Sequence, residues 1–152
     1  MITYHVESFA SAYEEAKPLI FNHWEEIALN QDSIKLNPDF EAYQNLEDQG
    51  RLHIYTAREG DKLVGYFAVI AIEHLHYKDH IFAHNDVIYV DPEYRKGFTA
   101  WRLIKFAEQQ LTLSGVSVMM INIKRHKPFD KLLNRLGFAE TESIFSKKLG
   151  AS

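Results

Sequence analysis

The chain has no cysteine among its 152 residues, which excludes disulfide scaffolds, zinc-thiolate centres and thiol nucleophiles. It has no apolar run near the ~20 residues that span a membrane, and Met1–Glu7 lacks the basic start and apolar core of a secretory signal. With a net charge of −4, it has no general attraction to nucleic acid or anionic lipid. Hydrophobic residues (46%) and charged residues (25%) are balanced as in globular proteins. We expect one soluble, cytoplasmic domain over residues 1–152, with no nucleic-acid or membrane partner.

The first third of the chain predicts one strand and two helices. Apolar residues alternate over residues 2–6, as in a strand. Ser11-Ala12-Tyr13-Glu14 has the pattern of a capping box and predicts the start of a helix, which Pro18 is expected to kink or divide. Asn37-Pro38-Asp39 predicts the start of a shorter helix that ends near Gly50.

The middle of the chain predicts a hairpin. Strand patterns over residues 52–59 and 62–72 flank the two-residue turn Gly60-Asp61. We expect a polar, histidine-rich loop over residues 73–80, and then another strand over residues 81–90.

The last third alternates between helices and strands. It predicts a helix over 98–114, a buried strand over 118–124, a short helix through Phe129 to Leu136, and a last strand over Ser143–Leu149. The order β-α-α-β-β-β-α-β-α-β is typical of an α/β (α+β) fold with a mixed sheet, in which hairpins come first and crossovers follow.

Residues 87–100 carry the clearest chemical signal. They comprise a strand end, a turn stopped by Pro92, a basic pair, Gly97 and the start of a long helix. The free amides of the first helical turn and the helix dipole can hold a pyrophosphate, and Gly97 lets the backbone come close to it. One glycine alone does not distinguish this arrangement from an ordinary strand-to-helix connection.

The same segment resembles the signature of the GNAT acetyltransferases, which transfer an acetyl group from acetyl-CoA to an amine. Ile88-Tyr89-Val90 matches the strand end before Pro92, Arg95–Ala100 matches the phosphate loop, and Leu136-Gly137-Phe138 matches the second signature. The element order also matches, which implies a mostly antiparallel central sheet with helices on both faces. Phage- and prophage-borne members are similar at His23–Ala28, Leu63–Tyr66, His74–Tyr77 and Arg135–Phe138.

The resemblance implies acetyl-CoA as co-substrate, an amine as acceptor and no metal. It implies cofactor contacts from the strand end, the phosphate loop and the start of the last helix, namely Ile88, Tyr89, Val90, Arg95, Lys96, Gly97, Phe98, Thr99, Ala100 and His126. The sequence departs from the family at Thr99, where a second glycine is common. It also departs at Leu133, where the family often has a tyrosine that serves as general acid.

The general base is expected on the strand over residues 81–90. Because alternating strand residues share a face, His84 and Asp86 are predicted to point the same way as Ile88 and Val90. In several family members the base lies four or six residues before the counterpart of Val90, which implies Asp86 or His84. Histidine titrates near neutral pH, whereas an aspartate needs burial or a water relay, and both stay open as the base.

Acceptor recognition is expected from two regions. On the first helix, which often borders the acceptor pocket in this family, His23 and Glu26 are candidates, and Glu26 could bind a cationic acceptor. Four of the eight histidines lie between residues 74 and 84, where His74, His76 and Tyr77 have either a recognition role or a structural one. His74 and His76 could also bind a metal with Asp79 or His80.

Three functions follow from these patterns. The leading one is an acetyl-CoA-dependent N-acetyltransferase. The second is a GNAT-fold protein that binds CoA or a host protein with little or no turnover, which Leu133 favours. The third is a metal-dependent hydrolase that uses the histidine cluster. The sequence leaves open the identity of the acceptor and the oligomeric state, a homodimer included.

Overall fold

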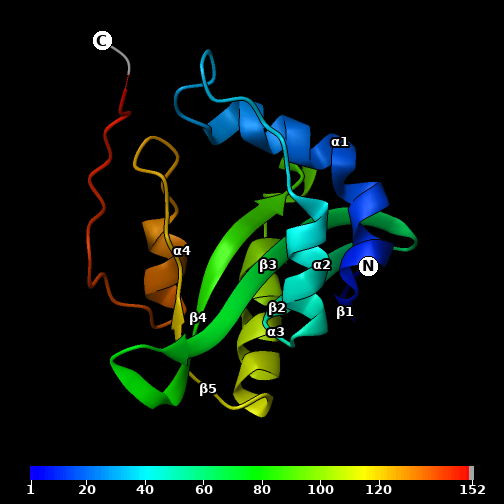
Figure 1. Cartoon of the computed structure of the whole chain (residues 1–152). Coiled ribbons are helices and arrows are strands. Elements are labelled where there is room, and N and C mark those ends of the chain that lie inside the picture. The colour runs from blue at the N-terminus through cyan, green and yellow to red at the C-terminus, as the bar shows by residue number, and fades with distance from the viewer. Residues whose placement is uncertain (151–152) are drawn as a thin grey trace.

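The computed structural model describes residues 1–150, and five of its elements are strands of one sheet (Figure 1). The strands follow the order β1-β2-β3-β4-β5, with antiparallel pairs except for the parallel pair β4–β5. In chain order the elements are β1 (Ile2–Glu7), α1 (Phe9–Ile27), α2 (Phe40–Asp48), β2 (Leu52–Glu59), β3 (Lys62–His74), β4 (Tyr77–Val90), the 3-10 turn η1 (Pro92–Tyr94), α3 (Thr99–Leu113), β5 (Val116–Met120) and α4 (Asp130–Arg135).

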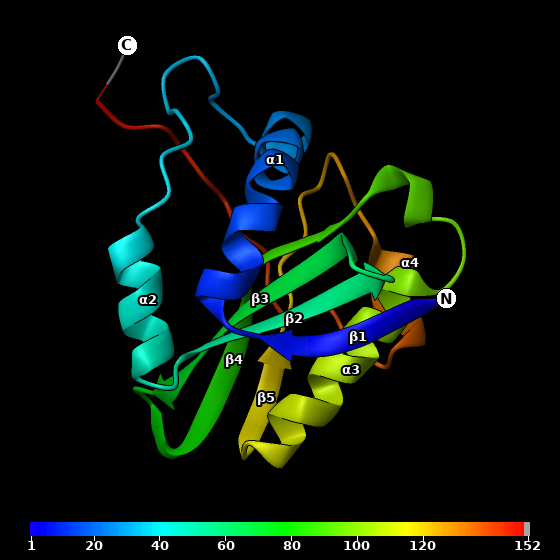
Figure 2. The same ribbon diagram turned by 90° about the vertical axis from the view of Figure 1, so that its right-hand side faces the viewer.

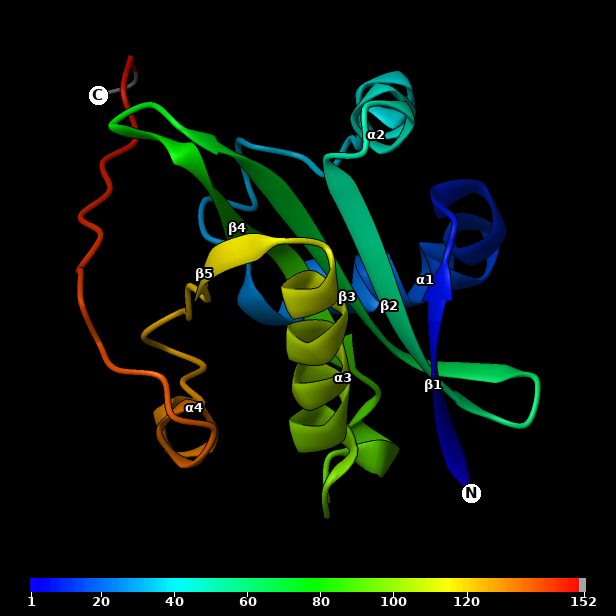
Figure 3. The ribbon, with the colours of Figure 1, turned by 90° about the horizontal axis from the view of Figure 1, so that it is seen from below.

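Helices cover both faces of the sheet. Helices α1 and α2 lie on one face, and α3 and α4 lie on the other (Figures 2 and 3). The α3 side holds the larger core, in which Phe67 and Val69 of β3 pack with Leu103 and Ile104 of α3. The α1 side holds smaller clusters built around Ala12, Ala16, Leu52, Ile54, Leu63, Tyr66, Ala68 and Tyr89. This arrangement confirms the predicted mixed, mostly antiparallel sheet with helices on both faces. None of the helices in the described chain is long and apolar enough to cross a membrane.

The first helix begins earlier than the capping-box pattern predicted. Ser8, not Ser11, is the N-cap, and its hydroxyl accepts the Ser11 N–H at 3.2 Å. The helix starts there because the added turn places Phe9 and Ala12 against the sheet. Pro18 does not divide α1, because it lies on the exposed side, where water can bind the carbonyl that its ring leaves free.

The predicted loop over residues 73–80 is mostly strand. Strand β3 extends to His74, and β4 starts at Tyr77, with the pair His74↔Tyr77 closing the ladder. The ring of His74 lies 4.9 Å from the ring of Tyr77 and 4.5 Å from that of Phe82, centroid to centroid. Packing between these rings therefore stabilises strand pairing over residues that their polarity predicted to be a loop.

The C-terminal strands differ from the prediction. β5 covers Val116–Met120 instead of residues 118–124, because the chain leaves the β4 edge after Met120. The predicted strand over Ser143–Leu149 is wrong, since the structure has neither helix nor strand there. Its apolar side chains at 144, 145 and 149 do not alternate, so no register would bury them on one face. All three are exposed.

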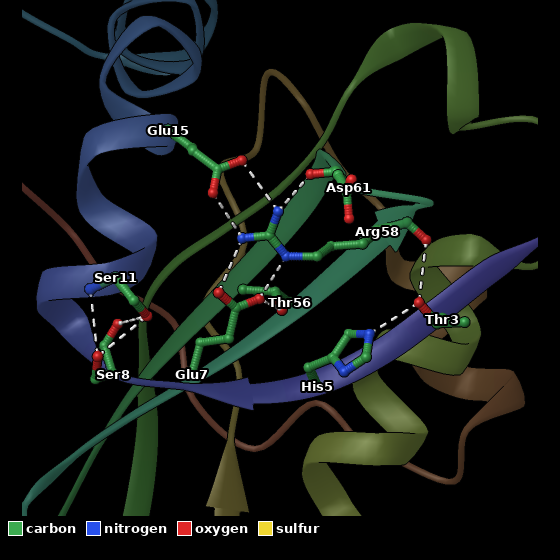
Figure 4. Close-up of polar contacts among 9 residues, drawn as sticks. All are labelled: Thr3, His5, Glu7, Ser8, Ser11, Glu15, Thr56, Arg58 and Asp61. Atoms are coloured by element: carbon green, nitrogen blue, oxygen red, sulfur yellow. Dashed lines mark hydrogen bonds and ion pairs between the residues drawn. The ribbon is translucent and has the colours of Figure 1, made fainter.

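A partly buried ion-pair cluster connects α1 to the sheet (Figure 4). Arg58 of β2 donates to both carboxylate oxygens of Glu7 at 2.7 and 2.9 Å, and to both oxygens of Glu15 of α1 at 3.0 Å. Glu7 also accepts a hydrogen bond from the Thr56 hydroxyl. The side chains of Arg58 and Glu7 are only 14% and 15% exposed, so this pair is shielded from water. Hydrogen bonding to Arg58 is the main cause of the lowered pKa of Glu7.

We predict that Arg58→Met lowers the free energy of unfolding by about 2–3 kcal/mol, because it leaves the Glu7 carboxylate buried without its partner. Arg125→Met is the matched control, since Arg125 is 67% exposed, and it should cost less than about 1 kcal/mol.

The pKa of Glu7 is depressed in the folded state. The stabilisation that the Glu7 carboxylate gives the folded protein is therefore complete when the pH is above its ordinary pKa of 4.5. It is lost as the pH falls through the lower pKa that Glu7 has in the folded protein. Urea unfolding at pH 7 and below pH 4 measures both effects. An equal decrease in the free energy of unfolding in Arg58→Met and Arg125→Met at pH 7 would contradict this account.

Candidate active site

Strands β4 and β5 diverge in the middle of the sheet. Their pairing ends at His84↔Met120, while β4 continues to Val90. At the point of divergence the side chain of Asn85 bonds to the backbone of Asn122 in place of backbone pairing between the strands. Its oxygen accepts a hydrogen bond from the Asn122 N–H at 2.7 Å, and its amide donates to the Asn122 carbonyl at 3.2 Å. Within the described chain, residues 87–90 are paired with β3 on one edge, and residues 86–90 are paired with no strand on the other. Their open backbone edge can pair with an extended ligand.

A β-bulge at Asp86 changes which side chains share a face. Ala68 pairs with Val87 and Val69 pairs with Asn85, so Asp86 is the extra residue between them. Asp86 and Val87 both line a pocket on the α1 side, whereas Ile88 and Val90 pack in the core on the α3 side.

His84 also lies on the opposite face of the sheet from Ile88 and Val90. It pairs with Ile70, which packs on the α1 side of the sheet. The prediction that His84, Asp86, Ile88 and Val90 point the same way is therefore wrong, because the bulge breaks the alternation between Asp86 and Ile88.

The pocket beside Asp86 has a volume of about 300 Å³ and lies between α1, the connection from α1 to α2, α2 and the sheet. Asp86 is exposed at this pocket and accepts a hydrogen bond from the Tyr43 hydroxyl of α2 at 2.5 Å. Burial, and then the Asp86 carboxylate, raise the pKa of Tyr43 well above its usual range. Tyr43 therefore keeps its proton at neutral pH, and its hydrogen bond orients the Asp86 carboxylate.

Tyr43 and Tyr66 are two of the polar residues of this pocket that the sequence interpretation missed. Tyr43 was assigned only to the apolar pattern of α2, and Tyr66 lies in a continuous apolar run of β3. Nothing local distinguishes either hydroxyl from a core phenol. Only the packing of α2 over the bulge brings Tyr43 to Asp86.

The predicted phosphate loop has an open backbone. Gly97 has a φ of +102°, and a Cβ there would have no atom within 4 Å, so its surroundings have room for a ligand. The first bond of α3 runs from the Arg102 N–H to the Phe98 carbonyl at 2.8 Å, so the amides of Thr99, Ala100 and Trp101 precede the helical ladder. Phe98 gives them no side-chain cap. Lys96 and Phe98 are exposed beside this turn.

Arg95 joins this loop to α1. Its guanidinium donates to the two oxygens of Glu26 at 2.7 and 2.9 Å, and its Nε donates to the Val90 carbonyl at 2.6 Å. It also lies 5.3 Å from the centre of the Tyr89 ring. The hydrogen bond from Arg95 is the main cause of the lowered pKa of Glu26. Arg95, expected at the cofactor, and Glu26, expected at the acceptor, therefore bind each other.

Three other candidates have structural contacts. His23 lies 5.1 Å from the Tyr89 ring, and burial lowers its pKa, which disfavours the charged imidazolium. The His126 Nε2 donates to the Ile27 carbonyl at 2.9 Å and connects the chain after β5 to the end of α1. Leu133 is 8% exposed and belongs to the core on the α3 side.

The histidine-rich hairpin tip does not meet the pocket. Tyr77 precedes Asp86 by nine residues of β4, which is about 30 Å of extended strand. His74 accepts the backbone N–H of His76 at 3.0 Å. His80 is bonded to the Ser117 hydroxyl at 2.8 Å. Residues 1–150 contain no group of three or more His, Cys, Asp and Glu side chains arranged to hold a metal.

We predict that the pKa of His23, measured by NMR titration, lies below its ordinary value of 6.5 and falls further in Glu26→Gln. The reason is that burial disfavours the imidazolium, while the Glu26 carboxylate is the charge that favours it. Glu140→Gln removes an exposed carboxylate that pairs with Arg125, and as the matched control it should leave His23 unchanged. A His23 pKa that rises in Glu26→Gln would contradict this account of the cluster.

Comparison with known proteins decides the family. The model of the acetyltransferase (GNAT) family matches residues 10–138. The chain belongs to the GNAT acetyltransferase family. No curated protein matches it in sequence. The resemblance to phage-borne members, the cytoplasmic location and the homodimer stay predictions.

Solved structures share the fold of this GNAT protein. An aminoglycoside acetyltransferase from an uncultured soil metagenomic sample, in complex with sisomicin, has a TM-score of 0.75 at 16% identity, over 98% of this chain and 97% of that one. The ribosomal-protein-alanine N-acetyltransferase of Brucella melitensis has a TM-score of 0.72 at 20% identity, over 99% and 100%. A protein of Clostridium acetobutylicum that is described as a predicted acetyltransferase, solved with acetyl-CoA, has a TM-score of 0.73 at 13% identity, over 98% of this chain and 97% of that one.

Proposed function

We propose that this GNAT protein is an acetyl-CoA-dependent N-acetyltransferase that acts on a primary amine by direct attack on the thioester. The observation that carries the proposal is the arrangement along β4. The Asp86 carboxylate faces a pocket, the backbone edge of residues 86–90 is open, and the uncapped loop around Gly97 follows the same strand. Acceptor, reacting centre and cofactor would thus meet along one strand.

The residues present fit the cofactor. The amides of Gly97, Thr99 and Ala100 would hold its pyrophosphate at the start of α3, beside the exposed Lys96 and Phe98. The open edge of Ile88, Tyr89 and Val90 would hold the pantetheine arm. In the arrangement seen here, Arg95 and His126 would support this site through Glu26 and Ile27.

Asp86 is the base that the geometry favours over His84. Asp86 lines the pocket and is oriented by Tyr43, whereas His84 is not among the residues that line the pocket. Acetyl-CoA supplies an activated acetyl group. Asp86 would take a proton from the acceptor ammonium, directly or through water, so that the neutral amine can attack. A backbone amide near Val90 would stabilise the oxyanion, and the leaving thiolate would take its proton from solvent, since Leu133 offers none.

We predict that Asp86→Asn lowers kcat by about 10²–10⁴-fold, the usual contribution of a general base, while acetyl-CoA affinity changes little. Asparagine can still accept the Tyr43 hydrogen bond, so the pocket should keep its shape. His84→Gln is the matched control. The measurement is acetyl transfer, followed by release of the CoA thiol, together with acetyl-CoA titration by calorimetry. Unchanged turnover in Asp86→Asn would rule out Asp86 as the base, and lost turnover in His84→Gln would assign the role to His84.

A second function has one observation in its favour. Leu133 is buried in the core, at the position where the family often has a tyrosine that serves as general acid. A protein that binds acetyl-CoA without transferring it would fit this substitution. Tight acetyl-CoA binding without transfer or hydrolysis over a broad amine panel would favour this binding protein over the enzyme.

A further inference from the structure

The walls of the pocket beside Asp86 are mainly apolar and aromatic. Rings from three elements line it, those of Phe9, Tyr13 and Trp24 on α1, Tyr43 on α2 and Tyr66 on β3. Three of these rings pack on one another, since Phe9 lies 5.3 Å from Tyr13 and is stacked 5.2 Å from Tyr43. A wall of mutually packed rings suits a flat or branched apolar group.

The charges of the pocket suit a single ammonium group. Among its lining residues only Asp86 and Lys35 carry a charge, and these two balance. Lys35 is held in the connection between α1 and α2, where its Nζ donates to the Gln31 carbonyl at 2.8 Å. A polycation would place its further ammonium groups against rings or near Lys35, where no carboxylate lines the pocket to receive them.

Tyr66 supplies an unused polar group. Its side chain lines the pocket and is 4% exposed, and its hydroxyl has no hydrogen-bond partner among residues 1–150. A buried hydroxyl without a partner is costly, so it marks a place where a ligand can supply one. The neighbouring Tyr43 already donates its proton to Asp86. The Tyr66 oxygen is itself shielded from solvent, so a ligand pairs with it only where a small shift of the pocket wall uncovers it.

We propose that the acceptor is a small monoamine with an apolar body about the size of one ring. Its amine would bind at Asp86 and Tyr66, and its body would lie against Phe9, Tyr13 and Trp24. This inference rests on the proposed function. Asp86 takes a first proton from the ammonium and passes it to water. The N–C bond then forms as the C–S bond of the thioester breaks, Asp86 takes the second proton from the nitrogen, and the CoA thiolate takes a proton from water. A volume of about 300 Å³ is at the lower end of small-molecule sites, which favours such an amine over a multi-ring aminoglycoside or a peptide.

The first experiment compares three acceptors with the full chain at saturating acetyl-CoA. We expect kcat/KM for 2-phenylethylamine to exceed that for spermidine and for sisomicin at least tenfold. Equal or better use of either polycation overturns the monoamine proposal and leaves the proposed function standing. Binding of acetyl-CoA without transfer to 2-phenylethylamine also overturns it. Failure of acetyl-CoA to bind, measured separately by calorimetry, overturns the proposed function itself.

The second experiment removes the Tyr66 hydroxyl. In Tyr66→Phe we expect KM for 2-phenylethylamine to rise about threefold to tenfold, with acetyl-CoA affinity unchanged and a melting temperature equal to or above that of the parent. Tyr55→Phe, which removes a phenolic hydroxyl from the core on the other face of the sheet, is the matched control and should leave KM unchanged. An unchanged KM in Tyr66→Phe would rule out its hydroxyl as an acceptor contact.

Discussion

The course of β4 is the constraint on which the rest of the structure depends. This strand pairs with β3 along its whole length but with β5 only as far as His84, and it carries an extra residue at Asp86. The divergence leaves a backbone edge without a strand partner in the described chain, and the bulge turns Asp86 to the α1 side. A regular strand in that place would pair its backbone edge with β5 and would keep Asp86 on the same face as Ile88.

Helix α1 lines the pocket and also contacts the loop that we assign to the cofactor, and one arginine binds each half of the helix. Arg58 binds Glu15 in the N-terminal half, and Arg95 binds Glu26 in the C-terminal half. The first contact is part of a shielded cluster that contributes to stability. The contact of Arg95 with Glu26 joins α1 to the loop that precedes α3. A movement of that loop would therefore change the packing of His23 and Tyr89.

Local patterns in the sequence predicted most of the elements, because periodicity and turn residues act over a few positions. The hairpin at Gly60-Asp61 and the helix after Gly97 lie where the patterns placed them. The bulge at Asp86 depends on how β3 pairs with β4, and the contact of Tyr43 with Asp86 depends on packing between residues 43 apart, so local patterns could predict neither. The predicted strand over Ser143–Leu149 failed for the opposite reason: apolar content indicated a strand that has no neighbour to pair with.

The most direct test of the account is a thermal melt with and without acetyl-CoA, for the parent chain and for Gly97→Glu. At about one hundred times Kd the ligand should add ~2.7 kcal/mol of stability, a rise of roughly 5–10 °C for a chain of this size. Glutamate at 97 should abolish this rise by adding bulk and negative charge where we place the pyrophosphate. Gly60→Glu, in a turn that also has a positive φ and open space, should keep it. No rise at millimolar acetyl-CoA, or an equal rise in Gly97→Glu, would contradict the account.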